Sequence, residues 1–221
     1  MSSMSVRVSA LVCGVLATMT GGASLRADVI MSAQSVISAP AISGVGSWNA
    51  AINQSGLATP YTSGVTDFAA YIASNPLHTG NNASTAYTSS EPVFSVALDL
   101  GQPVYITQMA IWNCRFNASG WRDISIATSS DPAFATSTSV GSFTLTFVGS
   151  AGGDPVPAQV LDVQDSAARY VRITVQNRYS GGSGTEVSEI AFGGVIPAPG
   201  AAALLGMGGV MATRRRRAAQ R

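Results

Sequence analysis

Apolar and polar residues alternate with a period of two along much of the second half of the chain. In "FSVALDLG" the apolar residues Phe94, Val96, Leu98 and Leu100 alternate with small or polar ones, and a glycine follows. Alternation that ends at a turn residue predicts a half-buried β-strand. The pattern returns in "PVYITQMAIWN", "RDISIATSS", "SVGSFTLTFVG", "AQVLDV", "ARYVRITVQN" and "TEVSEIAFGG".

Short turns separate these predicted strands. Gly, Pro and Asp mark the junctions, and the sequence between the strands shows no long amphipathic pattern. This arrangement favours an antiparallel β-sandwich over βαβ units. Residues 29–47 alternate only weakly and form either an entering strand or an ordered leader. Thr66 and Asp67 are placed to cap a turn of helix through Phe68 and Tyr71. We therefore predict an all-β fold with little helix.

The N-terminal residues have the three parts of a secretory signal peptide. "MSSMSVR" carries a positive charge, "VSALVCGVLATM" is apolar, and "TGGASLRA" supplies small residues. We predict that residues 1–27 are removed by cleavage after Ala27, with cleavage after Ala23 as the alternative. Cys114 is then the only cysteine left, so the mature chain has no internal disulfide.

Charge separates the predicted domain, residues 28–194, from the ends of the chain. This span holds eleven acidic residues and five arginines, so its net charge is −6, and the chain contains no lysine. An acidic body repels phosphate backbones, which excludes nucleic acid as a partner. Only 10% of all residues are charged, against about 25% in a typical soluble domain. Such a composition suits an exported β-protein.

The sequence offers little for catalysis. His78 is the only histidine, and no serine elbow, Cys/His pair or His cluster accompanies it. We interpret it as a surface-loop residue without a catalytic role. Most aspartates stand beside turns, where the side chain commonly bonds its own backbone. We therefore predict a protein that is not an enzyme.

Several segments together resemble the discoidin-like, galactose-binding-like domain, a β-sandwich with jelly-roll topology. In order, they are "STAYTSS", "FSVALDLGQPVYITQMAIWN", "WRDISIATSSDPAF", "ARYVRITVQNRYSGG" and "SEIAFGG". Thr85, Tyr87 and Ser89 occupy the family's T-x-W-x-S pattern, with tyrosine in place of tryptophan. The resemblance implies a non-catalytic binding module over residues 28–194.

The same resemblance implies a structural calcium ion. Many discoidin-like domains hold Ca²⁺ between the polar loop and an acidic residue of the last strand, and the matching positions here are Asn82, Thr85 and Glu189. Ca²⁺ prefers six to eight hard oxygen ligands. The loop aspartate of the family is absent, so Asn81 and Asn82 stand in its place and Asp67 is a substitute of the same charge.

Aromatic side chains near the predicted loops are candidates for glycan binding, because sugar C–H faces pack on aromatic rings. Trp121 and Tyr179 lie in Gly-rich surroundings, with Arg122 and Arg178 beside them, and an extracellular polysaccharide is the expected partner. Trp48 and Tyr61 also flank loop signals. Trp112 is assigned to the core or its edge.

The C-terminal segment, residues 195–221, resembles the PEP-CTERM sorting signal of bacteria, which an exosortase-type membrane protease recognises. It combines a proline-containing motif, an apolar run of 12 residues (201–212) and an arginine cluster. A membrane-crossing helix needs about 20 residues, so we expect only transient membrane insertion with the arginines inside. The usual glutamate of the motif is an alanine here. The motif is Ile196, Pro197, Ala198, Pro199 and Gly200, and the cluster is Arg214, Arg215, Arg216 and Arg217.

Two functions from different classes remain open. The first is an exported carbohydrate-binding module, placed at the cell envelope, at the cell surface or in the medium by its sorting signal. The second is a structural envelope or matrix protein without a small ligand, retained by its C-terminal hydrophobic segment. Binding to a polysaccharide separates the two.

Overall fold

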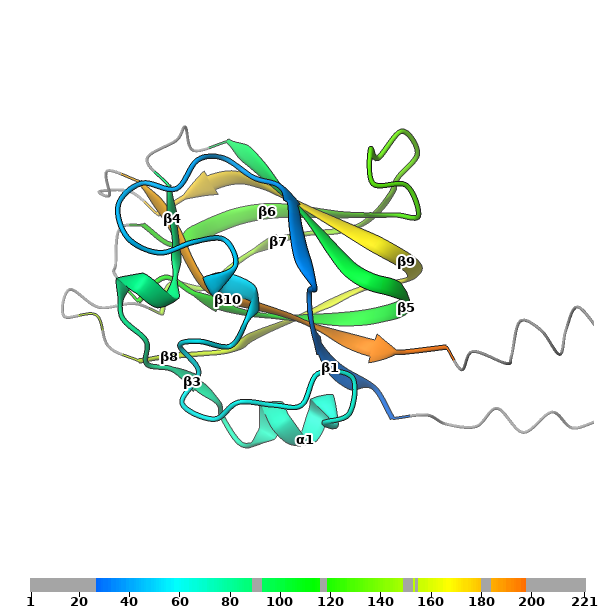
Figure 1. Ribbon diagram of the computed structural model, residues 1–221, viewed down its shortest axis with the longest axis horizontal. Helices are drawn as coiled ribbons and strands as arrows, with labels where there is room; N and C mark the ends of the chain where they lie inside the picture. The colour runs from blue at the N-terminus through cyan, green and yellow to red at the C-terminus, as the bar shows by residue number, and fades with distance from the viewer. Residues whose placement is uncertain are drawn as a thin grey trace, which may run out of the picture.

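A computed structural model describes residues 27–88, 93–115, 119–148, 153, 155–179 and 184–197. Within these ranges the chain forms antiparallel β-strands, one short α-helix and two 3₁₀ turns (Figure 1). The strands are β1 Val29–Ser32, β2 Ser35–Ser38, β3 Leu77–His78, β4 Ala86–Thr88, β5 Phe94–Asn113, β6 Trp121–Ser129, β7 Thr138–Thr144, β8 Val156–Pro157, β9 Gln159–Arg178 and β10 Thr185–Val195. The remaining elements are α1 Phe68–Ala73, η1 Ala50–Ile52 and η2 Asn82–Ser84.

The main sheet follows the strand order β1-β10-β5-β9-β6-β7, with β2 added to β5 and β4 added to β10. All these pairs are antiparallel, and β3 with β8 makes a separate two-stranded sheet. The strands lie in two layers that enclose the core (Figure 1). The predicted antiparallel β-sandwich with little helix is therefore confirmed.

The two longest strands each join segments that the sequence predicts as separate strands. β5 continues through Gly101, which adopts a φ of +81°. Its pairing with β9 is interrupted between Asp99 and Val104, where both strands pass from one part of the sandwich to the other. Asp99 Oδ1 accepts a hydrogen bond from Gly101 N at 2.7 Å, and Arg169 of β9 forms two 2.8 Å bonds to the same carboxylate. The Asp-Leu-Gly turn thus bends β5 without ending it.

Two groups of buried apolar residues stabilise the fold from opposite faces of β5 and β10. Ile111 and Phe192 belong to the main core, whereas their neighbours Trp112 and Ala191 belong to a second cluster with Tyr71 of α1. Alternation explains this division, because successive side chains of a strand point to opposite faces. Trp112 is fully buried and donates from Nε1 to Pro76 O at 2.8 Å, so its assignment to the core is confirmed.

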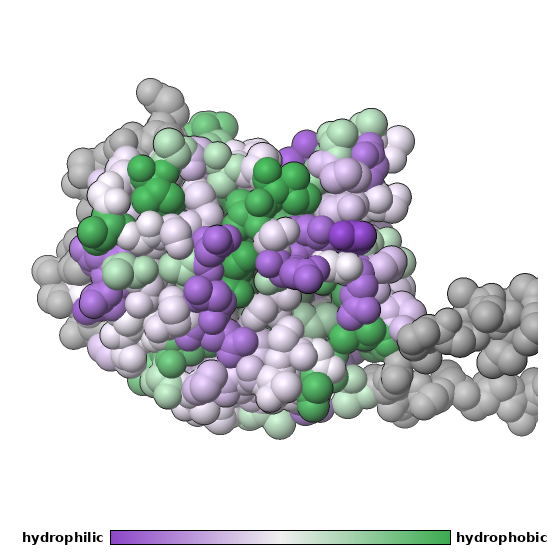
Figure 2. All heavy atoms as spheres, in the orientation of Figure 1, coloured by the Kyte–Doolittle hydropathy of each residue, from purple (hydrophilic) through white to green (hydrophobic). Residues whose placement is uncertain are grey.

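The early part of the chain adds edge strands and the helix. The weak alternation of residues 29–47 yields β1 and β2, so the entering-strand alternative is confirmed. α1 begins as predicted, because Asp67 Oδ1 accepts a hydrogen bond from Ala70 N at 2.7 Å at the N-cap. On the face shown in Figure 2, hydrophobic residues form separate groups divided by hydrophilic ones.

Both ends of the domain leave from one edge of the sandwich. β1 pairs with β10 so that Val29 lies opposite Gly194. Ile196, the first residue of the proposed sorting motif, packs partly buried against the main core. Ala198 to Gly200, the arginine cluster and residues 1–26 lie outside the described residues. The described part of the chain contains no helix with the length and apolar character needed to cross a membrane.

Candidate functional site

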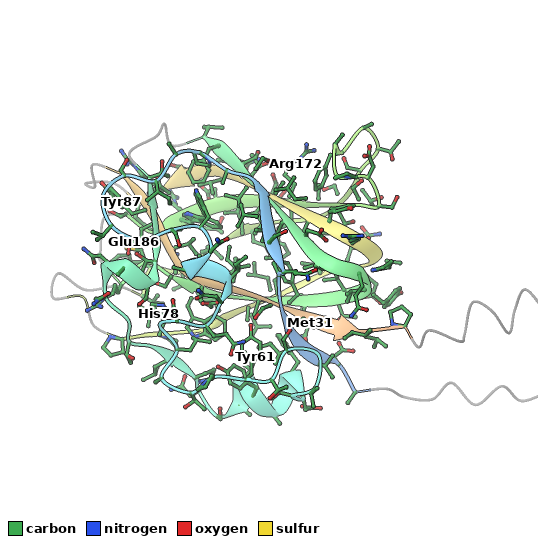
Figure 3. The ribbon with its side chains drawn as sticks, in the orientation of Figure 1. Met31, Tyr61, His78, Tyr87, Arg172 and Glu186 are labelled. Carbon is green, nitrogen blue, oxygen red and sulfur yellow. The ribbon has the colours of Figure 1, made fainter. Side chains whose placement is uncertain are left out.

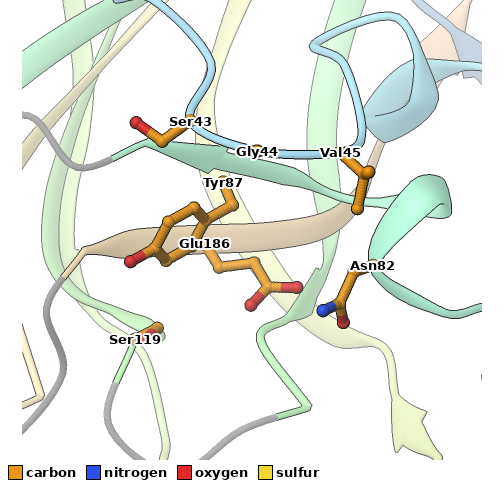
Figure 4. Close-up of a pocket in the computed structure, with 7 residues that line it drawn as sticks. All are labelled: Ser43, Gly44, Val45, Asn82, Tyr87, Ser119 and Glu186. Carbon is orange, nitrogen blue, oxygen red and sulfur yellow. The ribbon is translucent and has the colours of Figure 1, made fainter.

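Tyr87 and Glu186 lie at the end of the sandwich opposite the chain ends (Figure 3), and a pocket opens between them and the neighbouring loops. Its volume is about 330 Å³, within the range of small-molecule sites. It is formed by residues from loop 43–45, from β4, from Ser119 and from the start of β10 (Figure 4). The pocket is lined by Ser43, Gly44, Val45, Asn82, Tyr87, Ser119 and Glu186.

Backbone hydrogen bonds hold one rim of this pocket. Ser43 N donates to Tyr87 O at 2.9 Å, and Ser47 N donates to Thr85 O at 3.1 Å, so the loop lies along β4. Gly46 between them has a φ of +106°, and a Cβ there would lie 2.4 Å from Thr85 O. A glycine is therefore required for this close approach. These backbone contacts hold the rim of the pocket in place.

Glu186 is the charged residue of the lining. Its exposed fraction is 4%, and its backbone N donates to Ser119 O at 2.6 Å. The Sγ atom of Cys114, at the end of β5, donates to Glu186 Oε2 at 3.1 Å. Oε1 is buried and has no hydrogen-bond partner among the described residues. Figure 4 shows the carboxylate between Tyr87 and Asn82.

A second hollow of about 400 Å³ adjoins the pocket and shares Val45 and Asn82 with it. Arg115 lines this hollow. Its guanidinium donates to the carbonyl oxygens of Gly80 and of Gly153, the latter at 2.8 Å from Nε. Together the two hollows form a groove with a carboxylate in one part and a guanidinium in the other.

The structure corrects the prediction for Trp121. Its ring is fully buried, packed against Trp48 and Phe94 at centroid distances of 6.5 and 6.2 Å. No face of the ring is left for a sugar, because Trp121 begins β6 and points into the core. Trp48 and Tyr61, the other flanking aromatics, are also buried. Gly-rich surroundings had indicated a loop at Trp121, but its ring is buried by Trp48 and Phe94, which come from distant parts of the chain.

Tyr179, Arg122 and Arg178 do come together at the pocket end of the sheet. Tyr179 N donates a hydrogen bond to Gly120 O at 3.2 Å, and Gly120 directly follows Ser119 of the pocket lining. Arg178 pairs with Trp121 across β9 and β6, and Arg122 follows as an exposed residue. These three predicted residues therefore lie beside the pocket rather than in its lining.

Phe147 adds an aromatic ring that the sequence analysis did not single out. It is 42% exposed and meets the half-buried Tyr179 edge to face at 5.2 Å between centroids. The Tyr179 hydroxyl donates to Leu145 O, which holds the ring in place. The pair forms an exposed aromatic surface next to the pocket. In the sequence, Phe147 belongs to the predicted strand "SVGSFTLTFVG", whereas β7 ends at Thr144 and leaves Phe147 in the segment that follows.

The three calcium candidates differ in exposure and in hydrogen-bond partners. Asn82 is exposed and lines the pocket with Glu186, whereas Glu189 lies buried on β10 with its Oε2 accepting from Gln54 N at 3.0 Å. The Thr85 hydroxyl donates to Asn82 O at 3.2 Å. Among the described residues, no three acidic, His or Cys side chains gather as a metal cluster. One feature fits a cation: Glu189 Oε1 is buried without a partner in this part of the chain.

Glu189 belongs to a buried polar network. Gln54 donates from its side chain to Ser32 Oγ at 3.2 Å, and Ser32 Oγ and the Tyr61 hydroxyl are 2.8 Å apart. Burial raises the pKa of Glu189 to about 9, although the bond from Gln54 N opposes this shift. Burial and the nearby Glu189 raise the pKa of Tyr71 to about 12. The network is therefore neutral at physiological pH in the absence of a cation.

His78 is not a surface residue, contrary to the sequence interpretation. It lies fully buried in β3, and its Nε2 is 3.2 Å from Ser84 O. Burial lowers its pKa to about 4. A Cβ at Gly56 would lie 1.9 Å from Nε2, so the loop at Gly56 packs directly on the ring. The histidine thus joins the loop after η1 to Ser84, the last residue of η2.

Comparisons with known proteins found several solved structures of low sequence identity. No protein-family model and no curated protein matches the sequence. The C-terminal domain of a chitobiase from Bacteroides fragilis is 18% identical over 65% of this chain and 93% of its own, with a TM-score of 0.43. CpGH89CBM32-5 from Clostridium perfringens, in complex with GalNAc-β-1,3-galactose, is 13% identical over 75% of this chain and 92% of its own, with a TM-score of 0.44.

A third similar structure is CBM32-3 from a family 31 glycoside hydrolase of Clostridium perfringens. It is 17% identical over 66% of this chain and 96% of its own, with a TM-score of 0.41. The sandwich architecture follows from the strand pairing of the chain itself.

Proposed function

We propose that this chain is an exported, non-catalytic carbohydrate-binding protein whose glycan site is the pocket around Tyr87 and Glu186. The observation that carries the proposal is the lining itself. A carboxylate, the Asn82 amide and the hydroxyls of two serines surround a half-buried tyrosine ring. Aromatic faces pack on sugar rings, and convergent polar groups fix the hydroxyls.

The neighbouring aromatic surface supports an extended ligand. Phe147 and Tyr179 lie beyond Gly120, with Arg122 and Arg178 close to them. A polysaccharide chain that extends out of the pocket can contact this aromatic surface. We assign the pocket to the first sugar and the aromatic pair to a second contact.

The placement of the chain ends supports display at a surface. Val29 and Gly194 lie side by side at the far edge, while Tyr87 and Glu186 lie at the other end (Figure 3). A tail held in the membrane through residues 195–221 leaves the pocket facing outward. The exosortase-type protease is then a transient partner, and the mature protein resides in the envelope, on the surface or in the medium.

A structural calcium ion is part of this proposal. Glu189 would supply its carboxylate, with oxygens of Thr85 and Asn82 as the remaining side-chain candidates. The ion would neutralise the buried carboxylate and hold the loop before β4 to the last strand.

Binding of the full chain to a polysaccharide panel tests the function. Tyr87→Ala should weaken glycan binding by about tenfold, because one aromatic contact is worth about 0.5–1.5 kcal/mol. Tyr105→Ala is the matched control, since this exposed tyrosine pairs with Val195 at the other end of the sheet. If no glycan binds the folded wild-type chain, the structural envelope role is favoured instead.

A further inference from the structure

One oxygen of the pocket carboxylate is left without a hydrogen-bond donor. Cys114 Sγ donates a hydrogen bond to Glu186 Oε2 at 3.1 Å. The other oxygen, Oε1, has no hydrogen-bond partner among the described residues, although Glu186 is only 4% exposed. Burying an unpaired charged oxygen is costly. A group that donates to Oε1 from within the pocket therefore gains more there than at an exposed carboxylate.

The protein does not supply a countercharge for this carboxylate within its described residues. Their two ion pairs are Arg122 with Asp123 and Arg169 with Asp99. The Arg115 guanidinium, in the adjoining hollow, donates to the carbonyl oxygens of Gly80 and Gly153. The carboxylate is thus poised to receive a cationic group from a ligand.

A sugar hydroxyl and a protonated amine satisfy Oε1 to different degrees. Both donate a hydrogen bond, but only the amine also neutralises the charge, and charge-assisted bonds are about twice as strong as neutral ones. On this basis, and resting on the proposed function, we propose that the Glu186 pocket recognises an amino sugar with a free, protonated amino group. The ligand class is a cationic glycan such as a glucosamine polymer.

The shape of the site favours a sugar over a bare metal ion. The pocket holds about 330 Å³ and includes Val45 and the Tyr87 ring in its lining, so it suits a ring-shaped ligand with an apolar face. Ca²⁺ prefers six to eight oxygens, whereas Glu186 is the one acidic residue in this lining. The net charge of −6 over residues 28–194 also attracts a cationic polymer at long range.

The test compares short glucosamine oligosaccharides with their N-acetylated counterparts, titrated calorimetrically into the full chain at physiological salt. Acetylation removes the positive charge and leaves the sugar ring unchanged. We expect the free-amine form to bind at least about tenfold more tightly. In Glu186→Gln this preference should disappear, because the amide retains the size of the side chain without its charge.

Asp165→Asn is the matched control, since it makes the same charge change at an exposed residue by the bend of β9. It should keep the preference, which separates recognition at Glu186 from general attraction to an acidic protein. Thermal melting checks that both variants are folded. Equal or tighter binding of the acetylated form overturns this inference and leaves carbohydrate binding intact. Failure to bind these or any other glycan overturns the proposed function as well.

Discussion

Cys114 and Glu186 form a buried thiol–carboxylate hydrogen bond that joins the end of β5 to the start of β10, with Sγ 3.1 Å from Oε2. Asn113 and Val187, their respective neighbours, face each other in the strand pairing. The bond fixes one oxygen of the carboxylate and thereby orients the other within the pocket. The single cysteine of the predicted mature chain therefore has a structural role at the proposed binding site.

Two replacements of Cys114 should separate the contribution of its hydrogen bond to stability from that of its packing. Cys114→Ala removes the donor to Oε2 and should lower the free energy of unfolding by about 1–3 kcal/mol, because a buried acceptor loses its partner. Cys114→Ser keeps a donor and should lose less. Urea denaturation measures both. Equal stability of the alanine and wild-type proteins would show that the thiol bond contributes nothing.

Gly184 packs so closely against the Tyr87 ring that it leaves no room for a side chain. A Cβ at this position would lie 2.4 Å from Cζ of Tyr87 and 2.5 Å from Thr88 O. Gly184→Ala should therefore displace β4 and the ring, with a loss of about 1–3 kcal/mol in stability and weaker glycan binding. The double variant with Tyr87→Ala is the control. Because it removes the ring, it should recover part of the stability lost through the clash, and strictly additive losses would contradict this account.

The pH dependence of stability should show two buried groups acting in opposite directions. Glu189, with a pKa raised from 4.5 to about 9, contributes stability that is complete below pH 4.5 and is lost as the pH rises toward 9. His78, with a pKa lowered from 6.5 to about 4, contributes stability that is complete above pH 6.5 and is lost as the pH falls toward 4. The two slopes oppose each other between pH 4.5 and 6.5.

Above pH 6.5 only the Glu189 slope of this pair remains, so stability should fall by up to about 1.4 kcal/mol per pH unit toward pH 9. Glu189→Gln removes the titrating group and should abolish that fall. The His78 decline between pH 6.5 and 4.5, which the Glu189 slope offsets in the wild type, should then become visible. Denaturant unfolding at a series of pH values, in the presence of a chelator, measures the profile. A wild-type profile that stays flat from pH 6.5 to 9 would contradict protonation of buried Glu189.

Calcium should raise the melting temperature if the ion binds at Glu189. At a concentration tenfold above the dissociation constant, we expect a rise of about 3–6 °C, since binding to the native state adds about 1.4 kcal/mol. Glu189→Gln should remove the response, whereas Glu186→Gln, three residues earlier on the same strand, should keep it. An unchanged melting temperature at millimolar Ca²⁺ would remove the ion from the proposal.

The strands were predictable because burial imposes its period on the sequence. Val96 and Leu98 alternate with less apolar neighbours since one face of β5 meets the main core there. The length of β5 was not predictable in the same way. Gly101 and Pro103 indicate a turn, and only the bonds from Gly101 and Arg169 to Asp99 reveal that the strand bends and continues.

The site was harder to predict because its residues come from segments far apart in the sequence. Glu186 and Glu189 are three positions apart on one strand, and the register shift between Val187 and Glu189 breaks the regular alternation of faces there. A period of two therefore does not tell which face each side chain meets. Which of them meets the pocket depends on the loops that pack there, and the resemblance pointed only to Glu189. Trp121 failed as a surface residue for the same reason, since Trp48 and Phe94 cover it from distant parts of the chain.

The C-terminal segment carries the last prediction, which concerns where the chain is cut. Ile196 packs partly buried on the main core, and a Cβ at Gly64 would lie 2.9 Å from its Cδ1 atom. Removing Ile196 would therefore expose core surface at the edge where β10 ends at Val195. A cut after Ile196 leaves the sandwich complete. We expect the protease to cleave between Pro197 and Gly200.

The apolar run that follows is rich in Gly and Ala and holds 12 residues, so it gains little from burial in a bilayer of about 30 Å. The arginines from 214 to 217 resist transfer across the membrane and keep the tail inside until cleavage. Mass spectrometry of the mature protein from its own host should find a C-terminus between Pro197 and Gly200. Replacing the four arginines with alanine should prevent this processing. Recovery of peptides containing Met207 from mature, surface-exposed protein would show a retained anchor instead.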